Sequence, residues 1–555
     1  MVISAVATII LLCTLFVLAR GLSKLKYKSL KFLRGPPSPS WLFGHEYTFF
    51  NQAEVSGLSN SWIRDYGTAL RLGGPFGKDI LFLADPKALQ HIFHTSSYHY
   101  PKPLDMQDAF LKVFGKTIVT TEGNVHQRQR KALNPAFSAS QLKTFLSVFQ
   151  RSTQHLANKW QEKHFMDADE QGYCVINTTR WFSRLALDII GESAFDYKFG
   201  ALDEDDNVLS SISRDLFKDT SGPELSKTTM FFRLIRRQLL DLNIYNLLKE
   251  MPFVLTKEDK RFNTWLETAT DAARNILSKK AQSGYKAEEG DKDILSVLVR
   301  SNTTQDPKKR LDDKEMLDHM ATIILAGHET TSNTTTWLFY ELSRHPEHQE
   351  RILKELDTVK KRKLDAGKDE ALTAHDYDSM PFLNACIKEA LRLYPIIPHL
   401  VRCSERDDVI PLSEPAISVS GEKLTQIPVK KGQRIIIDIP SYNRLKSVWS
   451  EDPDTWNPER FLDSENQLRK DTTLGVYANL MSFSGGVRGC IGWRFALIEM
   501  QTILIGLLST FEFSIDPKLE FFRGLAGSVT PVLKGKEAEG PQMPLKVRLR
   551  TAVRV

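Results

Sequence analysis

The sequence has few cysteines, and they are scattered. There are five in 555 residues, Cys13, Cys174, Cys386, Cys403 and Cys490, and no two stand in a C-x-x-C spacing. An odd and dispersed set is unlike a disulfide framework or a zinc site, and it is typical of a reducing compartment. At least one of these cysteines therefore needs an explanation of its own.

The chain also lacks a strong excess of charge of one sign. Its net charge is +6, and no dense basic tract occurs in the body, so we expect no nucleic-acid partner. The composition is 41% hydrophobic and 26% charged, which supports a large core and excludes general disorder. We find no internal repeats and no interdomain linker after residue 40. The body is therefore expected to be one large domain, although length alone suggests several.

The amino terminus resembles a membrane anchor. Residues 2–19 carry no charged side chain and are long enough to span a bilayer as a helix. A basic flank without acidic residues follows from Arg20 to Arg34, and the positive-inside rule keeps it in the cytosol. A cleaved signal peptide is the alternative, but the basic cluster follows the apolar run and no convincing cleavage site precedes it. We predict a transmembrane anchor over residues 1–20, a basic flank and Pro-rich hinge over 21–40, and the body over 41–555.

Helical patterns dominate the body. Apolar residues recur at helical spacing between Leu317 and Leu325, and Asp312 with Glu315 forms a capping box before them. Two further helices are expected over Pro381–Tyr394 and Trp493–Phe511. The expected strands are short: Ala69–Leu72, Ile80–Ala84 and Arg434–Ile439. The stretch Phe231–Pro252 is apolar but interrupted by arginines, which indicates an amphipathic helix on a membrane surface or on the core.

The segment around Cys490 carries the strongest chemical signal. Three glycines occur among the five residues before Cys490, and they allow tight bends and close approach of a flat ligand. Backbone N–H groups and the start of a following helix would then favour a thiolate at the sulfur. Arg488 is well placed to meet an anionic group. A lone cysteine is more often a small buried hydrophobe, but these neighbours favour the functional interpretation.

This segment resembles the F-x-x-G-x-R-x-C-x-G signature of the cytochrome P-450 family. Phe483, Gly486, Arg488, Cys490 and Gly492 match every fixed position. Other family signatures follow in order, so the resemblance covers nearly the whole chain. It implies a mainly α fold with small β-sheets, and haem b held by the thiolate of Cys490. Phe483 would contact the haem.

A second signature is Ala326-Gly327-His328-Glu329-Thr330-Thr331, inside the predicted helix that begins near Asp312. The resemblance implies that this helix crosses the haem face where oxygen binds. Ala326 and Gly327 would leave room there, and Thr330 would bond back to an upstream carbonyl. Glu329 and Thr330 would be the catalytic acid–alcohol pair that delivers protons.

The resemblance also implies a buried network and a set of haem-propionate contacts. Glu389 and Arg392 match one signature and would join Arg460 in a structural network below the haem. Arg488, Arg402 and Arg130 would bind the propionates, because guanidinium pairs well with carboxylate. His126 stands where the family has tryptophan. It is kept as a haem contact through a ring N–H, with a lone exposed histidine as the alternative.

The implied reaction is monooxygenation: one atom of O₂ enters an apolar substrate and the other leaves as water. We find no flavin or nicotinamide fingerprint, so the electrons are expected from a membrane-bound NADPH–cytochrome P-450 reductase, with cytochrome b5 as a further partner. The reductase could bind to positive charge offered by Arg128, Lys131 and Arg494. The protein is expected in the endoplasmic reticulum membrane, anchored in the lipid bilayer with its catalytic domain cytosolic.

The substrate is expected to be a terpenoid, steroid, fatty or polycyclic compound, because the segments that would line the pocket are largely aliphatic and aromatic. The motif variants look like those of fungal members, which favours secondary metabolism or xenobiotic oxidation. One alternative is a haem-thiolate enzyme that isomerises or dehydrates a peroxide without a reductase. Others are a non-catalytic haem-binding sensor and a membrane protein without haem.

Overall fold

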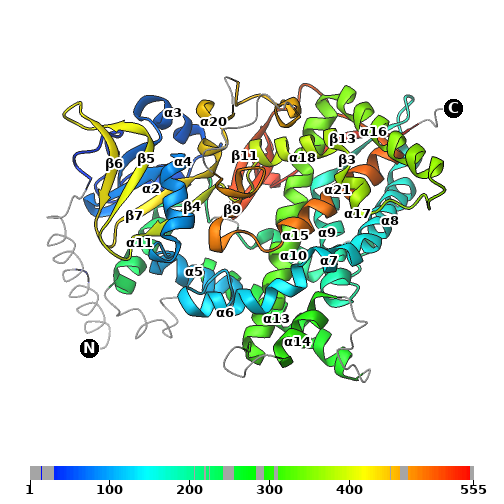
Figure 1. Cartoon of the computed structure of the whole chain (residues 1–555), viewed down its shortest axis with the longest axis horizontal. Helices are drawn as coiled ribbons and strands as arrows, with labels where there is room; N and C mark the ends of the chain where they lie inside the picture. The colour runs from blue at the N-terminus through cyan, green and yellow to red at the C-terminus, as the bar shows by residue number, and fades with distance from the viewer. Residues whose placement is uncertain are drawn as a thin grey trace.

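The computed structural model describes residues 14, 30–204, 207–217, 220–223, 225–241, 256–282, 293–304, 310–449, 452–462 and 473–550. Helices make up most of this part of the chain. The strands form a four-stranded sheet, a three-stranded sheet and three two-stranded pairs. In Figure 1 the four-stranded sheet lies on the left and the helix-rich part on the right. The predicted class, mainly α with small sheets, is confirmed.

The elements have the following bounds. The helices are α2 Glu46–Phe50, α3 Gly57–Tyr66, α4 Pro86–Gln90, α5 Leu104–Phe114, α6 Gly123–Leu133, α7 Ala139–Leu142, α8 Leu146–His164, α9 Thr178–Phe195, α10 Val208–Asp215, α11 Lys227–Asp241, α13 Lys257–Gln282, α14 Ile294–Thr304, α15 Asp313–Arg344, α16 Pro346–Asp365, α17 Ala374–Asp378, α18 Pro381–Leu393, α19 Ile439–Tyr442, α20 Lys446–Trp449 and α21 Trp493–Thr510. The strands are β1 Ala69–Gly73, β2 Asp79–Leu83, β3 Tyr173–Asn177, β4 His399–Cys403, β5 Asp408–Ile417, β6 Lys423–Val429, β7 Arg434–Asp438, β8 Gly475–Tyr477, β9 Leu480–Gly485, β10 Phe511–Ser514, β11 Phe521–Ala526, β12 Ser528–Leu533 and β13 Pro544–Leu549.

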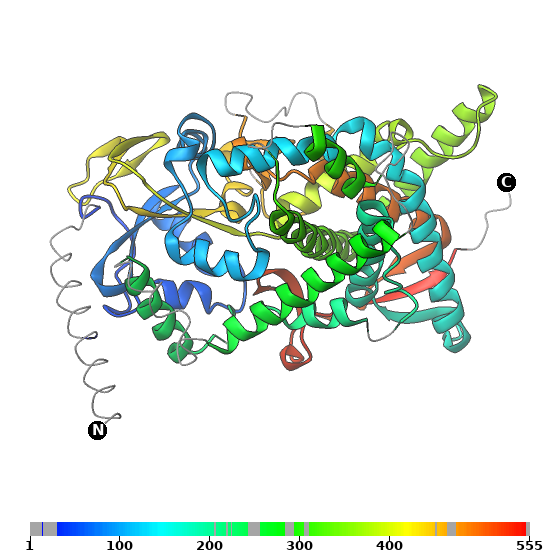
Figure 2. The same cartoon turned by 90° about the horizontal axis from the view of Figure 1, so that it is seen from below.

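Helix α15 has 32 residues and crosses the middle of the molecule (Figures 1 and 2). The predicted capping box is present: the Glu315 N–H donates to the Asp312 carboxylate over 2.7 Å, and the Asp312 N–H donates back to Glu315 over 3.3 Å. Satisfying these two donors fixes where the helix begins. The helix packs on α9, α13, α18 and β12, so elements from both halves of the chain meet on it.

The four-stranded sheet has the order β1-β2-β7-β4. β2 and β7 are parallel, and the two outer pairs are antiparallel. The three predicted strands are confirmed to within about one residue at each end. β7 ends at Asp438 instead of Ile439, because the Asp438 carboxylate accepts from the Ser441 N–H over 3.0 Å and caps α19.

The predicted membrane anchor and most of its basic flank lie outside the described residues. Among the described residues, the structure contains no helix long and apolar enough to cross a bilayer. The Pro-rich segment that follows forms no helix, and it lies against the sheet. The Arg71 N–H donates to the Arg34 carbonyl over 2.9 Å, and a Cβ at Gly35 would lie 1.8 Å from the Arg71 carbonyl. Leu30 and Leu33 are fully buried, so this segment is part of the packed body.

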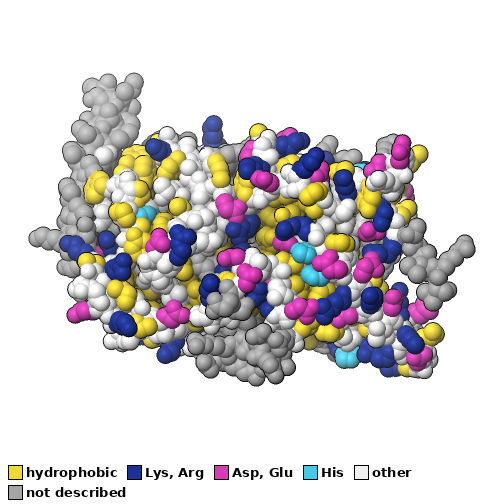
Figure 3. Space-filling view, turned by 90° about the horizontal axis from the view of Figure 1, so that it is seen from above, with side chains coloured by type: hydrophobic (Ala, Val, Ile, Leu, Met, Phe, Trp, Pro, Cys, Tyr) yellow, Lys and Arg dark blue, Asp and Glu magenta, His cyan; other side chains and the backbone are white. Residues whose placement is uncertain are grey.

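The amphipathic helix predicted from Phe231 is confirmed as α11, and the later part of that stretch lies outside the described residues. Its arginines pair with acidic residues of the body, as Arg233 does with Glu258 at 3.0 Å. Phe231 and Phe232 stay 38% and 55% exposed. Elsewhere, basic and acidic side chains are interspersed over the face drawn in Figure 3.

Candidate active site

Cys490 follows a tight turn between β9 and α21. Its N–H donates to the Phe483 carbonyl over 2.9 Å, which closes the loop. Gly486 has φ +62°, and a Cβ there would lie 1.8 Å from the Phe93 carbonyl. A Cβ at Gly485 would lie 2.2 Å from another carbonyl. The glycines are therefore needed because other backbone segments approach the loop closely.

The Cys490 side chain is accessible although protein surrounds it. Burial raises the pKa of its thiol, while the Gly492 N–H and the Arg130 guanidinium lower it. The sulfur therefore has the hydrogen bond and the positive neighbour that favour a thiolate ligand.

Glu329 and Thr330 lie in the middle of the helix α15. The Thr330 hydroxyl donates to the Ala326 carbonyl over 2.8 Å, so the predicted back-bond is present. The Glu329 carboxyl accepts from the Ser528 hydroxyl over 2.8 Å. Burial raises the pKa of Glu329 to about 7, although the Ser528 bond lowers it. A carboxyl group with this pKa can give up and regain a proton near neutral pH.

Ala326 and Gly327 differ in their surroundings. Ala326 is exposed within a helix whose neighbouring residues are mostly buried, as expected for a residue that faces a cavity. A Cβ at Gly327 would lie 2.6 Å from the Ile190 side chain of α9. Gly327 is therefore needed for close packing of α9 on α15, a reason that the sequence pattern does not reveal. Its predicted haem contact stays a prediction.

Arg402 is a buried cation on β4, the strand position predicted for it. It is 5% exposed and donates to the Val401 carbonyl over 2.9 Å. No carboxylate pairs with it in the described part of the chain. Burial lowers its pKa to about 10, so it remains charged at neutral pH. A buried guanidinium of this kind requires an anionic partner.

Lys102 and Arg488 add to this positive region, and sequence reasoning missed Lys102. Both side chains pair with Glu122, and the Lys102 Nζ lies 3.3 Å from the Glu122 carboxylate. Burial, together with Arg402 and Arg488, nevertheless lowers the pKa of Lys102 to about 6. At neutral pH this amine is therefore mostly uncharged, and a bound anion would favour its protonated form. The guanidinium groups of Arg402 and Arg488 face the single carboxylate of Glu122, which pairs with Arg488. Lys102 stands between two prolines and belongs to no signature, so only its burial identifies it.

His126 and Arg130 both lie on α6. His126 is 2% exposed and its Nδ1 lies 3.1 Å from the Tyr98 hydroxyl. Burial, Lys102 and Arg130 lower its pKa to about 4, so the ring is neutral at pH 7. Arg130 donates to the Gly489 carbonyl over 2.5 Å. The structure therefore places Arg130 on the cysteine loop, where it stabilises the turn before Cys490, and its predicted propionate contact stays a prediction.

Comparison with known proteins gives the family. The sequence model of the family described as cytochrome P450 matches residues 34–531. The chain belongs to the cytochrome P450 family. Two relatives from Postia placenta, cytochrome P450 monooxygenases 205 and 128, are 30% and 32% identical to it. Those alignments cover 94% of this chain and 93% and 92% of theirs. A ganoderic acid synthetase from Ganoderma lucidum is 32% identical over 87% of this chain and 88% of its own. The protein is thus a P450 monooxygenase similar to fungal members.

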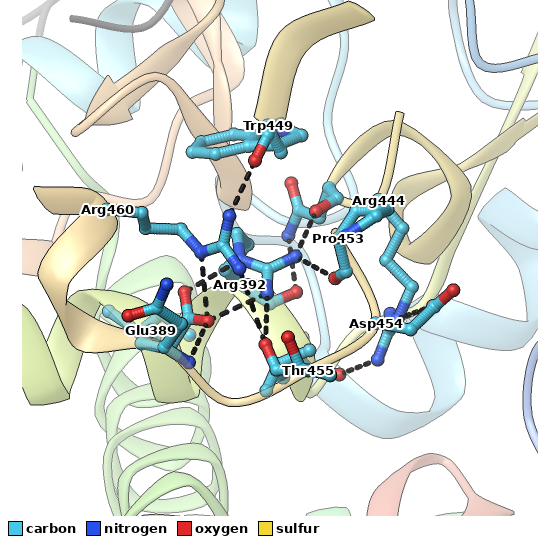
Figure 4. Close-up of polar contacts among 12 residues, drawn as sticks. Glu389, Arg392, Arg444, Trp449, Pro453, Asp454, Thr455 and Arg460 are labelled. Carbon is cyan, nitrogen blue, oxygen red and sulfur yellow. Dashed lines mark hydrogen bonds and ion pairs between the residues drawn. The ribbon is translucent and has the colours of Figure 1, made fainter. Parts of the chain in front are cut away.

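The predicted structural network of this P450 is confirmed (Figure 4). Glu389 and Arg392 are fully buried, and the Arg392 Nε donates to the Glu389 carboxylate over 2.7 Å. The Arg460 Nε also donates to the Glu389 carboxylate, over 3.0 Å, and the same guanidinium donates to the Trp449 carbonyl. Each buried charge is paired, and further donors reach backbone carbonyls, which is the arrangement that makes a buried ion network tolerable.

Asn443 connects this network to the strand that leads to Cys490. The Arg392 guanidinium donates to the Asn443 carbonyl over 3.0 Å. The Asn443 side-chain amide donates to the Ser482 hydroxyl over 3.0 Å, and its oxygen accepts from the Met481 N–H over 3.3 Å. Both partners belong to β9. The position of the cysteine loop of the P450 is therefore tied to the buried ion network.

The residues present fit a haem. A haem-thiolate site needs one sulfur ligand, cations for two propionates and small residues on the opposite face. Cys490 offers the sulfur, the guanidinium groups of Arg402 and Arg488 outnumber the one carboxylate of Glu122, and Ala326 is a small exposed residue.

Proposed function

We propose that this P450 holds haem b through the Cys490 thiolate and oxidises an apolar substrate. One oxygen atom of O₂ enters the substrate and the other leaves as water. The observation that carries the proposal is the accessible Cys490 in its glycine loop, together with the buried Arg402 guanidinium, which has no carboxylate partner among the described residues. Bound haem supplies the oxygen-activating chemistry, and a thiolate ligand favours O–O cleavage.

The chain's own residues would position the cofactor and move protons. Arg402, Arg488 and Arg130 would hold the propionates, with Lys102 as a further donor. The Glu329 carboxyl, with a pKa near 7, would release and regain protons, and the neighbouring Thr330 hydroxyl would receive them. Glu389, Arg392 and Arg460 would act only by fixing the frame beneath the site.

The proposed substrate is a terpenoid, steroid, fatty or polycyclic compound, oxidised in secondary metabolism or in the removal of foreign compounds. The similarity to a ganoderic acid synthetase supports a role in secondary metabolism. A spin-state screen of the purified ferric protein against compounds of these four classes tests the substrate. Binding of an apolar compound beside the haem should shift the Soret band. A compound class whose members never shift the band is excluded as the substrate class.

The proposed electron donor is an NADPH–cytochrome P450 reductase, with cytochrome b5 as a second donor. Lys131 and Arg494 are exposed and can offer positive charge to it. Arg128 does not support this role, because it is paired with Glu315 at 2.6 Å. We place the protein in the endoplasmic reticulum membrane, anchored by residues 1–20 with the remaining domain, residues 41–555, in the cytosol.

The carbon-monoxide difference spectrum of the reduced protein tests the core of the proposal. The wild type is expected to give a thiolate-type Soret band, and Cys490→Ala is expected to abolish it. Cys386→Ala is the matched control, since that buried cysteine should leave the band unchanged. A thiolate-type band that survives Cys490→Ala would refute the ligand assignment.

Turnover separates the remaining alternatives. A monooxygenase consumes NADPH in the presence of reductase and substrate. Activity with hydroperoxides alone would instead support the peroxide isomerase or dehydratase, although the Glu329–Thr330 pair argues against it. A haem spectrum without substrate-dependent NADPH consumption would support the sensor. A protein without any haem spectrum would support a membrane protein without haem.

A further inference from the structure

Glu329 has a partner that comes from a distant part of the chain. Ser528 is the first residue of β12, beside the turn at Gly527, and is 3% exposed. Its hydroxyl donates to the Glu329 carboxylate over 2.8 Å. No ion pair involves Glu329 within the described residues, so this bond is the specific contact that holds the carboxyl group.

Asn333 completes a short chain of hydrogen bonds. It lies four residues after Glu329 on α15, so the two side chains share one helix face. The Asn333 Nδ2 donates to the Ser528 Oγ over 3.1 Å, and Asn333 is 5% exposed. Because the amide donates, the one hydroxyl proton of Ser528 is directed toward Glu329. The amide thus fixes the direction of the bond that Glu329 receives.

The β11–β12 hairpin has its own anchors, which hold Ser528 in place. The Val529 N–H donates to the Ile396 carbonyl over 2.8 Å. The Ser221 hydroxyl donates to the Leu525 carbonyl over 2.9 Å, which ties the hairpin to the segment before α11. The hydroxyl that contacts Glu329 is therefore presented by a fixed backbone.

We propose that Ser528 is a positioning residue for the proton-delivering carboxyl group of Glu329, and that Asn333 acts through Ser528 by orienting its hydroxyl. This inference rests on the proposed function of Glu329. The Ser528 bond stabilises the ionised carboxylate and holds it in one orientation. Its loss should therefore make Glu329 a weaker acid and reduce the efficiency of proton delivery.

The first test is an infrared difference titration of the ferric holoenzyme between about pH 5 and pH 9. The band that Glu329→Gln removes belongs to the protonated Glu329 carboxyl group. Ser528→Ala is expected to raise the midpoint of its titration by about one pH unit, because a charge-assisted bond is lost. Asn333→Ala should raise it by less, and Ser528→Thr, which keeps the hydroxyl, should restore the wild-type midpoint.

Ser221→Ala is the matched control, since it removes another serine bond of the same hairpin without touching Glu329. An unchanged midpoint in Ser528→Ala, or an equal change in Ser221→Ala, would overturn the proposal. An equal change in the two variants would mean that Ser528 acts only by holding the hairpin in place. The titration needs no turnover. A failure of the proposed monooxygenase function would appear separately, in the carbon-monoxide spectrum and in NADPH consumption.

A second readout is the amount of hydrogen peroxide released per NADPH consumed, with reductase and the tightest ligand from the spin-state screen. Ser528→Ala should release several times more peroxide than the wild type, while Ser221→Ala should match the wild type. Equal peroxide yields in all three proteins, together with an unchanged midpoint, would refute a positioning role.

Discussion

Glu499 on α21 is a second buried carboxyl group without a cation beside it. It is fully buried, and neither of its carboxyl oxygens has a hydrogen-bond partner of good geometry in the described part of the chain. Burial raises its pKa well above the usual 4.5, and only the nearby Thr331 hydroxyl lowers it. Burial therefore favours the neutral form of Glu499, which lies on α21 near Thr331 of α15.

This state makes stability depend on pH. When the pKa of a carboxyl group is higher in the folded state, its contribution is fully present below the unfolded value of about 4.5 and is lost as the pH rises toward the folded value. Glu499→Gln, which is neutral at every pH, should remove this loss. The free energy of unfolding of the variant should gain on the wild type by up to about 1.4 kcal/mol per pH unit above pH 5.

Urea unfolding at a series of pH values measures the difference between the two proteins. The control is Glu370→Gln, an exposed residue between α16 and α17, which should parallel the wild type. If Glu499→Gln and the wild type give parallel curves from about pH 5 to pH 8, then Glu499 is not protonated in the native protein.

Ionic contacts between elements hold α11 on the body. Arg237 pairs with Glu46 at 2.8 Å and with Asp105 of α5 at 2.9 Å. Arg236 pairs with Asp259 of α13 at 2.8 Å. Glu46 and Asp259 are each 1% exposed. Burial alone would raise the pKa of Glu46, but the arginines outweigh it and lower the pKa, so the carboxylate stays ionised.

Arg237→Met should destabilise the protein by about 3–5 kcal/mol, because it leaves buried carboxylates with too little positive charge. Urea unfolding of the holoenzyme measures the loss, and hydrogen exchange should locate it in α11. The control is Arg64→Met, whose pair with Asp65 is 76% and 54% exposed and should contribute no more than about 0.5 kcal/mol. Equal effects of the two substitutions would contradict a stabilising role for the buried pair.

Local patterns predict elements well where one face is buried. β1 and β2 follow from their apolar runs, and α15 from its period and capping box. The pair β5 and β6 was not predicted, because its strands contain Pro411 and Pro428 and stay partly exposed. The pairing of β3 with β13 joins Asn177 to Pro544, a separation that no local pattern reveals.

The same limit applies to the site. Cys490, Arg488, Glu329 and Thr330 stand in contiguous signatures, so the sequence identifies them. Ser528 reaches Glu329 from 199 residues away, through a hairpin whose position depends on tertiary contacts. Contacts of that kind follow only from the folded backbone.

At the scale of the whole molecule, two separate sets of contacts support the site. Glu329 on α15 is held by Ser528 of the C-terminal hairpin. The buried ions around Arg392 are joined through Asn443 to the cysteine loop. Proton delivery and sulfur ligation are thus supported by separate contacts, and changes in one set should leave the other spectroscopically intact.

The first residues of the described body give a further prediction. Leu30 and Leu33 are fully buried, and the Leu30 N–H donates to the Asp79 carboxylate over 3.2 Å. A chain lacking residues 1–28 should therefore keep the melting temperature and the carbon-monoxide spectrum of the full chain. A chain lacking residues 1–40 loses both leucines, each worth about 1.5–3 kcal/mol of burial, and should melt several degrees lower.

Fractionation of the same proteins tests the proposed anchor. If residues 1–20 are the anchor, the full chain should sediment with membranes and the chain lacking residues 1–28 should remain in the supernatant. A shortened chain that still sediments would assign membrane binding to the body, where Phe231 and Phe232 of α11 are exposed. The double substitution Phe231→Ser and Phe232→Ser in the shortened chain would then release it. Folding and membrane attachment are thereby measured separately, because Leu30 and Leu33 are present in the chain lacking residues 1–28 and absent from the chain lacking residues 1–40.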